Sequence, residues 1–193
     1  RCNEMGALLI LDEIQPGFGR TGKLFAFEHF NCPPDILVIG KGMASGLPVG
    51  AFVASHDLMA DLKEKPKFGH ITTFGGNPVI AAASLATLKE ITETDLIPQT
   101  LEKEKLFRNL LQHPLIKEIR GKGLMLAPIM ESKEIADYLV LEASKKGLIL
   151  FWLLFEPKAV RISPPLTISM KEIEEGCDQI LGILNSYKSD TVN

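Results

Sequence analysis

Residues 8–23 read LLILDEIQPGFGRTGK, and the interpretation of the whole chain starts from this stretch. The apolar run 7–11 ends in two acids, Asp12 and Glu13. Such a run is typical of a strand that is covered on both faces of a parallel sheet. Residues 16–22 then hold three glycines and a proline, which indicates a loop. The stretch therefore predicts an α/β fold with Asp12 at the carboxyl end of a buried strand.

Length and composition limit the classes of protein that fit. The chain has 193 residues, 46% of them hydrophobic and 23% charged, which is typical of a soluble globular protein with one large and one small domain. A net charge of −3 gives no electrostatic basis for binding nucleic acid or an anionic membrane. The longest run of bulky apolar residues, 148–155, is too short to cross a bilayer. Neither nucleic acid nor membrane is expected as a partner.

The cysteines and histidines indicate neither a disulfide framework nor a metal site. Cys2, Cys32 and Cys177 are far apart, and a sparse, odd set is typical of free thiols in a reducing compartment. We therefore expect a cytoplasmic protein. The four histidines show no ligand spacing, so no metal is expected.

Strand and helix signals divide the chain into two parts. Residues 36–39 and 50–54 predict two further strands, and Asn77 followed by Pro78 predicts the start of a helix. The character changes near residue 113. We expect a large α/β domain with parallel character over residues 1–112, including a connecting helix, and a small α+β domain over residues 113–193. Because a strand pattern begins as early as residue 7, we also expect the sequence to be the later part of a longer protein.

The second part alternates strands and helices. A capping box formed by Ser169 and Glu172 predicts the start of the last helix, and Ser132 is the expected cap of the helix before it. Strands are expected within residues 116–130, on both sides of Gly121-Lys122-Gly123, and over residues 148–155 and 159–162; helices are expected over residues 132–146 and 169–187.

One interpretation of residues 8–23 is the core of a nucleotide-hydrolysing enzyme, because GFGRTGK resembles a phosphate-binding loop. That loop requires a hydroxyl residue after its lysine to hold magnesium, and residue 24 is leucine. The loop should also precede the acidic strand, whereas here it follows it. The sequence therefore argues against an ATPase and against Lys23 as a functional lysine.

A second interpretation joins Asp12 to Lys41, which ends the next predicted strand between Gly40 and Gly42. Ligands of open α/β sheets bind beyond the carboxyl ends of the strands, so both side chains reach one crevice if the strands are close. An acid and a lysine that converge in this way suit pyridoxal phosphate: the lysine binds the aldehyde as a Schiff base, and the acid partners the pyridine nitrogen. Ile14, two residues after Asp12, could lie against the flat ring.

The residues around this pair carry a family resemblance. The chain is similar to the class III pyridoxal-phosphate aminotransferases, the group of acetylornithine, ornithine and 4-aminobutyrate aminotransferases. This resemblance implies the carboxyl-terminal half of a fold type I enzyme, with part of its large, mainly parallel-sheet domain and its small α+β domain. The family's amino-terminal half is not in these residues. The matching stretches are LLILDEIQPGFGRTGKLFAFEHF, PPDILVIGKGMASGLPVGAFVAS, HITTFGGNPVIAAASLATL, IRGKGLMLA and VRISPPLTIS.

The resemblance also implies roles for single residues. Asp12 corresponds to the partner of the pyridine nitrogen, Ile14 to a residue that packs on the ring, and Gln15 to a glutamine near the ring hydroxyl. Lys41 corresponds to the Schiff-base lysine. Thr73 corresponds to a threonine that binds the cofactor phosphate of the neighbouring subunit, and Arg161 to the arginine that binds the substrate α-carboxylate. Thr73 thus implies a homodimer with its active site at the subunit interface. For Glu13 we expect a structural role, because on a strand it points away from Asp12.

The expected activity is a ping-pong transamination. An ω-amino acid such as acetylornithine or ornithine is the expected donor, and a 2-oxo acid such as 2-oxoglutarate is the expected acceptor; the resemblance supplies both. Two alternatives stay open at this point. One is another reaction on the same scaffold, such as racemisation, isomerisation or decarboxylation. The other is a non-catalytic fragment, because half of the implied cofactor site is missing from these residues.

Overall fold

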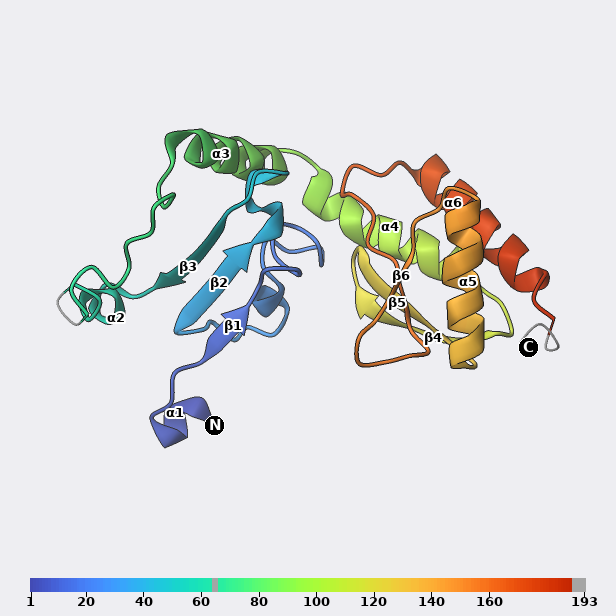
Figure 1. Cartoon of the computed structure of the whole chain (residues 1–193), viewed down its shortest axis with the longest axis horizontal. Coiled ribbons are helices and arrows are strands. Elements are labelled where there is room, and N and C mark those ends of the chain that lie inside the picture. The colour runs from blue at the N-terminus through green and yellow to red at the C-terminus, as the bar shows by residue number, and fades with distance from the viewer. Residues whose placement is uncertain (64–65, 189–193) are drawn as a thin grey trace. The chain divides into compact units, whose positions relative to one another are not determined.

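The computed structural model describes residues 1–63 and 66–188 (Figure 1). The chain folds into two compact units, Arg1–Ile97 and Pro98–Asn193. The division falls inside α4 (Leu96–Leu110), so that most of this helix belongs to the second unit. The reason is that Phe107 and Leu111 are part of the core of the second unit.

The first unit is built on a sheet of three strands in the order β1-β2-β3 (Figure 1). These are β1 (Ile10–Asp12), β2 (Ile36–Gly40) and β3 (Gly50–Ala54). β1 and β2 run parallel, whereas β2 and β3 are antiparallel. The two strands predicted from residues 36–39 and 50–54 are thus confirmed, and the parallel character expected of this part is carried by the β1–β2 pair.

β1 is shorter and more exposed than its apolar sequence predicts. Pairing begins at Ile10 rather than at residue 7. Leu8 and Ile10 are 53% and 57% exposed, so the expectation of a strand covered on both faces is wrong within the described residues. Apolar residues of this kind favour a covered sheet, and the segments described here leave one side of β1 open.

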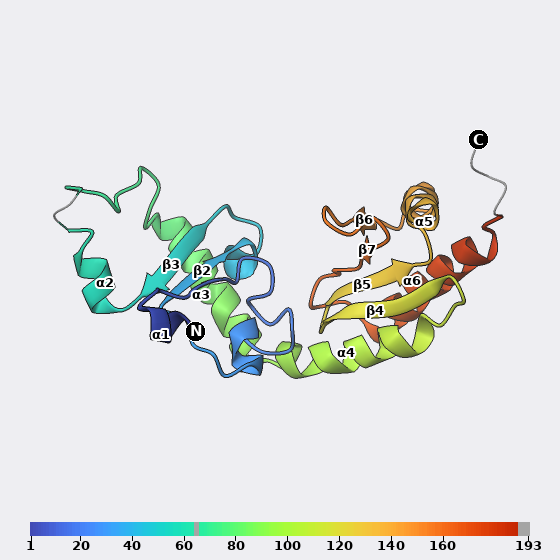
Figure 2. The same cartoon turned by 90° about the horizontal axis from the view of Figure 1, so that it is seen from below.

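Helical segments come before β1 and after each of the three strands. The helix predicted from Asn77 and Pro78 is confirmed as α3, and the Asn77 side chain accepts hydrogen bonds from the first turn. α3 lies beside η2, which directly follows β2 (Figure 2). Phe18, Ile39 and Ile91 form the small buried core of this unit. The helical elements are α1 (Cys2–Met5), η1 (Ala26–His29), η2 (Lys41–Ala44), α2 (His56–Ala60) and α3 (Pro78–Glu93).

The second unit packs helices onto two small antiparallel sheets. β4 (Ile116–Lys122) pairs with β5 (Met125–Met130), and β6 (Phe151–Trp152) pairs with β7 (Val160–Arg161). Bridges from Leu126 to Ile162 and from Ile129 to Ala159 connect the two sheets. The helices are α5 (Lys133–Lys145) and α6 (Met170–Asn185), which lie side by side (Figure 1).

The capping signals read from the sequence of this unit are confirmed. Ser132 caps α5, and Ser169 and Glu172 form the predicted capping box of α6. Hydrogen bonds from the Ser169 backbone and side chain lower the pKa of Glu172. The strand predicted over residues 148–155 is correct only at Phe151 and Trp152, because only these two residues pair with β7.

The core of the second unit is continuous and fully buried. Leu124, Leu139, Val160 and Ile173 are among its members, together with Cys177. Burial raises the pKa of the Cys177 thiol to about 12, and the charge of Asp178 adds to the effect. The three cysteines are free thiols. No helix in the described part of the chain is long and apolar enough to span a bilayer.

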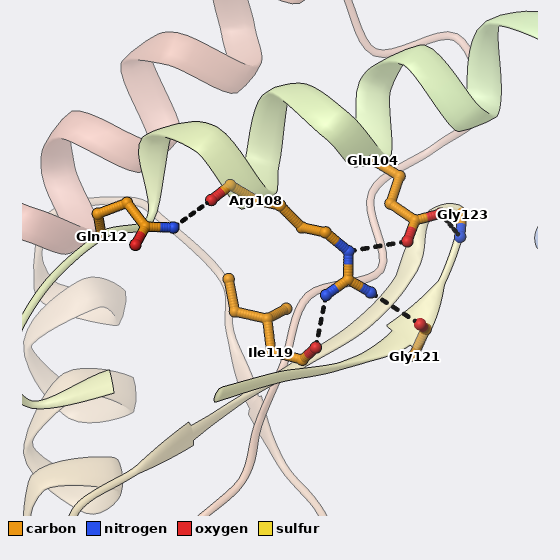
Figure 3. Close-up of polar contacts among 6 residues, drawn as sticks. All are labelled: Glu104, Arg108, Gln112, Ile119, Gly121 and Gly123. Carbon is orange, nitrogen blue, oxygen red and sulfur yellow. Dashed lines mark hydrogen bonds and ion pairs between the residues drawn. The ribbon is translucent and has the colours of Figure 1, made fainter. Parts of the chain in front are cut away.

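A polar clamp joins α4 to the β4–β5 hairpin (Figure 3). Arg108 donates hydrogen bonds to the carbonyl oxygens of Ile119 and Gly121, and its Nε lies 2.8 Å from Oε1 of Glu104. The other carboxylate oxygen of Glu104 accepts from the Gly123 backbone N–H at 2.6 Å. Gly121 has a φ of 103°, and a side chain there would collide with the Met125 carbonyl oxygen, so the turn requires glycine. The clamp therefore sets how the hairpin is held on the helix.

We predict that Arg108→Met lowers the free energy of unfolding by about 2 kcal/mol, because two backbone carbonyls and one carboxylate lose a charged donor. Arg120→Met is the matched control. Arg120 pairs with Glu118 and Glu156 in solvent and should unfold like wild type. Urea unfolding followed by circular dichroism measures both. Equal effects of the two substitutions would contradict a stabilising role of the clamp.

Candidate active site

Asp12 is the last residue of β1, and Lys41 is the first residue after the neighbouring parallel strand β2. In the β1–β2 register Asp12 is opposite Val38, and the Glu13 N–H extends the ladder by donating to the Val38 carbonyl at 2.8 Å. Lys41 follows directly after β2. The condition set by the sequence analysis, that these strands lie close, is met. Both residues therefore lie at the edge of the sheet where ligands of α/β folds bind.

The Asp12 carboxylate is exposed and held by its own backbone. Its Oδ1 accepts a hydrogen bond from the Ile14 N–H at 2.9 Å, which is the geometry of an Asx turn. This bond fixes the direction of the carboxylate without another side chain. Gln15 follows in the same turn and is also exposed. The turn thus presents a carboxylate and an amide at the sheet edge.

Lys41 stands in an unusual backbone conformation. Its φ is 42°, in the left-handed region that a lysine rarely adopts, and its side chain is exposed. Such strain costs on the order of 1–3 kcal/mol and is common at functional sites. The residues that follow are packed more closely: Ala44 is buried, and a Cβ added at Gly42 would lie 3.5 Å from the Phe18 Cβ. The chain therefore turns sharply at Lys41 and presents its amine outward.

Ile14 packs against the end of the second strand. A Cβ added at Gly40 would lie 3.6 Å from Ile14 Cγ2 and 3.3 Å from the Val49 carbonyl oxygen. The half-buried Ile14 side chain therefore contacts the backbone immediately before Lys41. An apolar side chain thus lies beside the end of β2, next to Lys41 in the chain.

Glu13 has the structural environment that the sequence analysis expected. It is 2% exposed, and its two carboxylate oxygens accept hydrogen bonds from the N–H groups of Ala26 and Phe27 at 2.9 and 2.8 Å. These N–H groups belong to the first turn of η1, where helix donors lack partners of their own. Glu13 therefore connects the end of β1 to the start of η1 through two hydrogen bonds. No sequence signal pairs residue 13 with residues 26 and 27.

Thr73 lies on the turn that leads into α3. It is exposed, and its neighbours Thr72 and Phe74 line a cavity of about 520 Å³. The cavity lies between η2, the start of β3 and the first turns of α3. Its other lining residues are Met43, Pro48, Val49, Gly50, Ala51, Gly75, Gly76, Asn77, Ile80, Ala81 and Ser84.

Arg161 belongs to the second unit, on β7. Its guanidinium carbon lies 5.0 Å from the centre of the Phe151 ring. Its Nε is buried without a hydrogen-bond partner among the residues described. Phe151 could not be found from the sequence, because nothing in it shows that residues 151 and 161 are opposite each other.

A family model for class III aminotransferases matches residues 1–184. The chain belongs to the class III aminotransferases. This family depends on pyridoxal phosphate, and one solved relative, ornithine aminotransferase from Toxoplasma gondii, is described with partial occupancy of PLP at its active site. The family expected from the sequence and its cofactor are thereby confirmed.

Several aminotransferases resemble this class III chain over most of its length. Acetylornithine aminotransferase of Caldanaerobacter subterraneus subsp. tengcongensis is 39% identical over 97% of the chain and 47% of the relative. The Toxoplasma structure is 32% identical, with a TM-score of 0.85 over 95% of this chain and 44% of the other. Acetylornithine aminotransferase from Elizabethkingia anophelis is 31% identical, with a TM-score of 0.85 over 96% and 47%. The α/β fold of these enzymes is therefore confirmed, and the chain spans about half their length.

We predict that Glu13→Gln destabilises the protein by about 2 kcal/mol, because an amide cannot accept from both buried N–H groups as a carboxylate does. Glu28→Gln is the control, since Glu28 accepts one N–H bond at an exposed position. Thermal unfolding measures the difference. A Glu13→Gln variant with wild-type stability and a greatly reduced turnover number would instead indicate a catalytic base.

Proposed function

We propose that the protein transfers an amino group from an amino acid to a 2-oxo acid, with pyridoxal phosphate as cofactor. The observation that carries this proposal is the position of Asp12 and Lys41 at the ends of adjacent parallel strands. Membership of the class III aminotransferases supports the same reaction.

The residues at the sheet edge fit the cofactor chemically. The exposed Asp12 carboxylate suits a protonated ring nitrogen, the Ile14 side chain suits a flat ring face, and the exposed Lys41 amine suits an aldehyde. Gln15 would approach the ring hydroxyl. Thr73 would bind the phosphate in the site of a second subunit, so we also propose a homodimer.

Each residue contributes a separate part of the reaction. When bound, pyridoxal phosphate supplies an electron sink for the substrate carbon that carries the amino group. Asp12 keeps the ring nitrogen protonated by placing a negative charge beside it. Lys41 would hold the cofactor through Nζ, and its free amine would carry the proton from the substrate carbon to the cofactor carbon. Arg161 would bind the substrate α-carboxylate through two hydrogen bonds.

The substrates belong to the proposal as well. The relatives are named acetylornithine and ornithine aminotransferases, which supports an ω-amino acid donor of that kind. We propose 2-oxoglutarate as acceptor. A cytoplasmic location fits the three free thiols.

We predict that Lys41→Ala abolishes transamination and the visible absorbance of covalently bound cofactor in the complete protein. Asp12→Asn should keep that absorbance and lower the turnover number by at least about a hundredfold, because a charge beside the ring is lost. Lys23→Ala is the control and should behave as wild type. Retention of activity and absorbance by Lys41→Ala would rule out the assignment.

The donor is identified by incubating the complete protein with 2-oxoglutarate and a panel of amino acids, and measuring glutamate. We expect glutamate with acetylornithine or ornithine and none without a donor. Turnover of an amino acid in the absence of any 2-oxo acid would instead favour racemisation, isomerisation or decarboxylation.

A further inference from the structure

The environment of Arg161 is unusual for an arginine with a ligand-binding role. An aromatic ring faces its guanidinium group: the Phe151 centroid lies 5.0 Å from Cζ, within the range of a cation–π contact. Its Nε is buried without a hydrogen bond, and no carboxylate among the described residues forms an ion pair with it. Among the described residues, the Phe151 ring is therefore the group that can orient the guanidinium.

The position of Phe151 follows from strand pairing. In the antiparallel β6–β7 pair, Phe151 and Arg161 are direct partners across the strands. Side chains of directly opposite residues project on the same face and lie about 4.5–5.5 Å apart at Cβ. The ring is thus brought to Arg161 by the backbone register.

Both strands of this pair are fastened to the rest of the unit. The Trp152 indole N–H donates a hydrogen bond to Asp137 on α5 at 2.7 Å. Because side chains alternate along a strand, Trp152 projects from the face of β6 opposite to that of Phe151. Beyond Arg161, Ile162 exchanges two backbone hydrogen bonds with Leu126, at 2.9 and 3.0 Å. The backbone at both ends of the Phe151–Arg161 contact is therefore fixed.

A ring orients an arginine in a way that suits a substrate site. A neighbouring carboxylate would also hold the guanidinium, but it would occupy N–H donors and neutralise the charge that a substrate carboxylate needs. An aromatic face attracts the cation and leaves the N–H donors at the edge of the plane available. A planar fork that is already oriented loses less conformational entropy when it binds a carboxylate through two bonds.

We propose that Phe151 is a positioning residue: its ring holds the Arg161 guanidinium in the orientation that binds the substrate α-carboxylate. This inference rests on the proposed function, in which Arg161 binds that carboxylate. Phe151 itself does not contact reacting atoms. Its side chain is 49% exposed, which is unusual for a phenylalanine that serves only as core.

The test is Phe151→Leu in the complete protein. Leucine keeps an apolar side chain on β6 and removes the aromatic face. The apparent dissociation constant of the amino donor, measured by titrating the absorbance change of the bound cofactor, should rise about threefold to tenfold. KM for the donor and for the 2-oxo acid should rise in the same proportion, while kcat at saturation stays near wild type, because the lost contact acts on binding.

Three further variants separate positioning from folding. Phe155→Leu makes the same chemical change in the same segment at a ring that is 97% exposed, and it should leave every constant unchanged. Phe151→Tyr keeps the aromatic face and should retain wild-type affinity. In an Arg161→Gln background Phe151→Leu should cause no additional loss, because the cation that the ring orients is gone.

The outcomes are distinguishable from those that test the proposed function. Wild-type protein without transaminase activity on any donor would overturn the proposed function and this inference with it. Active wild-type protein with an unchanged Phe151→Leu variant would overturn only the role of Phe151. An equal loss in the wild-type and Arg161→Gln backgrounds, or a fall in melting temperature with unchanged affinity, would show that Phe151 acts on folding alone and would also overturn it.

Discussion

The parallel pairing of β1 with β2 is the constraint on which the candidate site depends. Its register places Asp12 opposite Val38, so that the carboxyl ends of both strands lie at one edge. The features of the candidate site in the first unit all lie at that edge. They are the Asx turn at Asp12, the sharp turn at Lys41 and the packing of Ile14 against the end of β2. A shift of the register by one residue would turn the Asp12 side chain to the other face of the sheet.

The residues that stabilise the fold around the candidate site differ from the residues proposed to act on substrate. Glu13 is adjacent to Asp12, yet alternation along the strand sends its side chain inward, where it satisfies two N–H groups of η1. Two consecutive acids therefore divide into a structural and a proposed chemical role. The second unit also separates a structural part from a proposed substrate-binding residue. The Glu104–Arg108 clamp holds the β4–β5 hairpin, and Arg161 is the proposed substrate-binding residue. The strand of Arg161 is joined to that hairpin by the bridge between Ile162 and Leu126.

Several apolar side chains of the first unit are exposed. The chain matches about half the length of its relatives. Leu8 before β1, Ile10 on β1 and Val79 on α3 are exposed. Apolar sheet faces of α/β enzymes are normally covered. The sequence pattern of β1 is thus that of a covered strand, whereas Ile10 is exposed in the structure.

The amino-acid sequence by itself determined the local elements and the chemistry. Apolar runs located β2 and β3, the Ser169–Glu172 capping box located the start of α6, and the spacing of Asp12 and Lys41 at predicted strand ends indicated pyridoxal phosphate. Only the tertiary structure decided which strands are neighbours, what the Glu13 carboxylate binds and that Phe151 faces Arg161. The physical reason is that capping and periodicity act over a few residues and can be read in order. Strand register and buried hydrogen bonds join residues distant in sequence, so they exist only once the chain has folded.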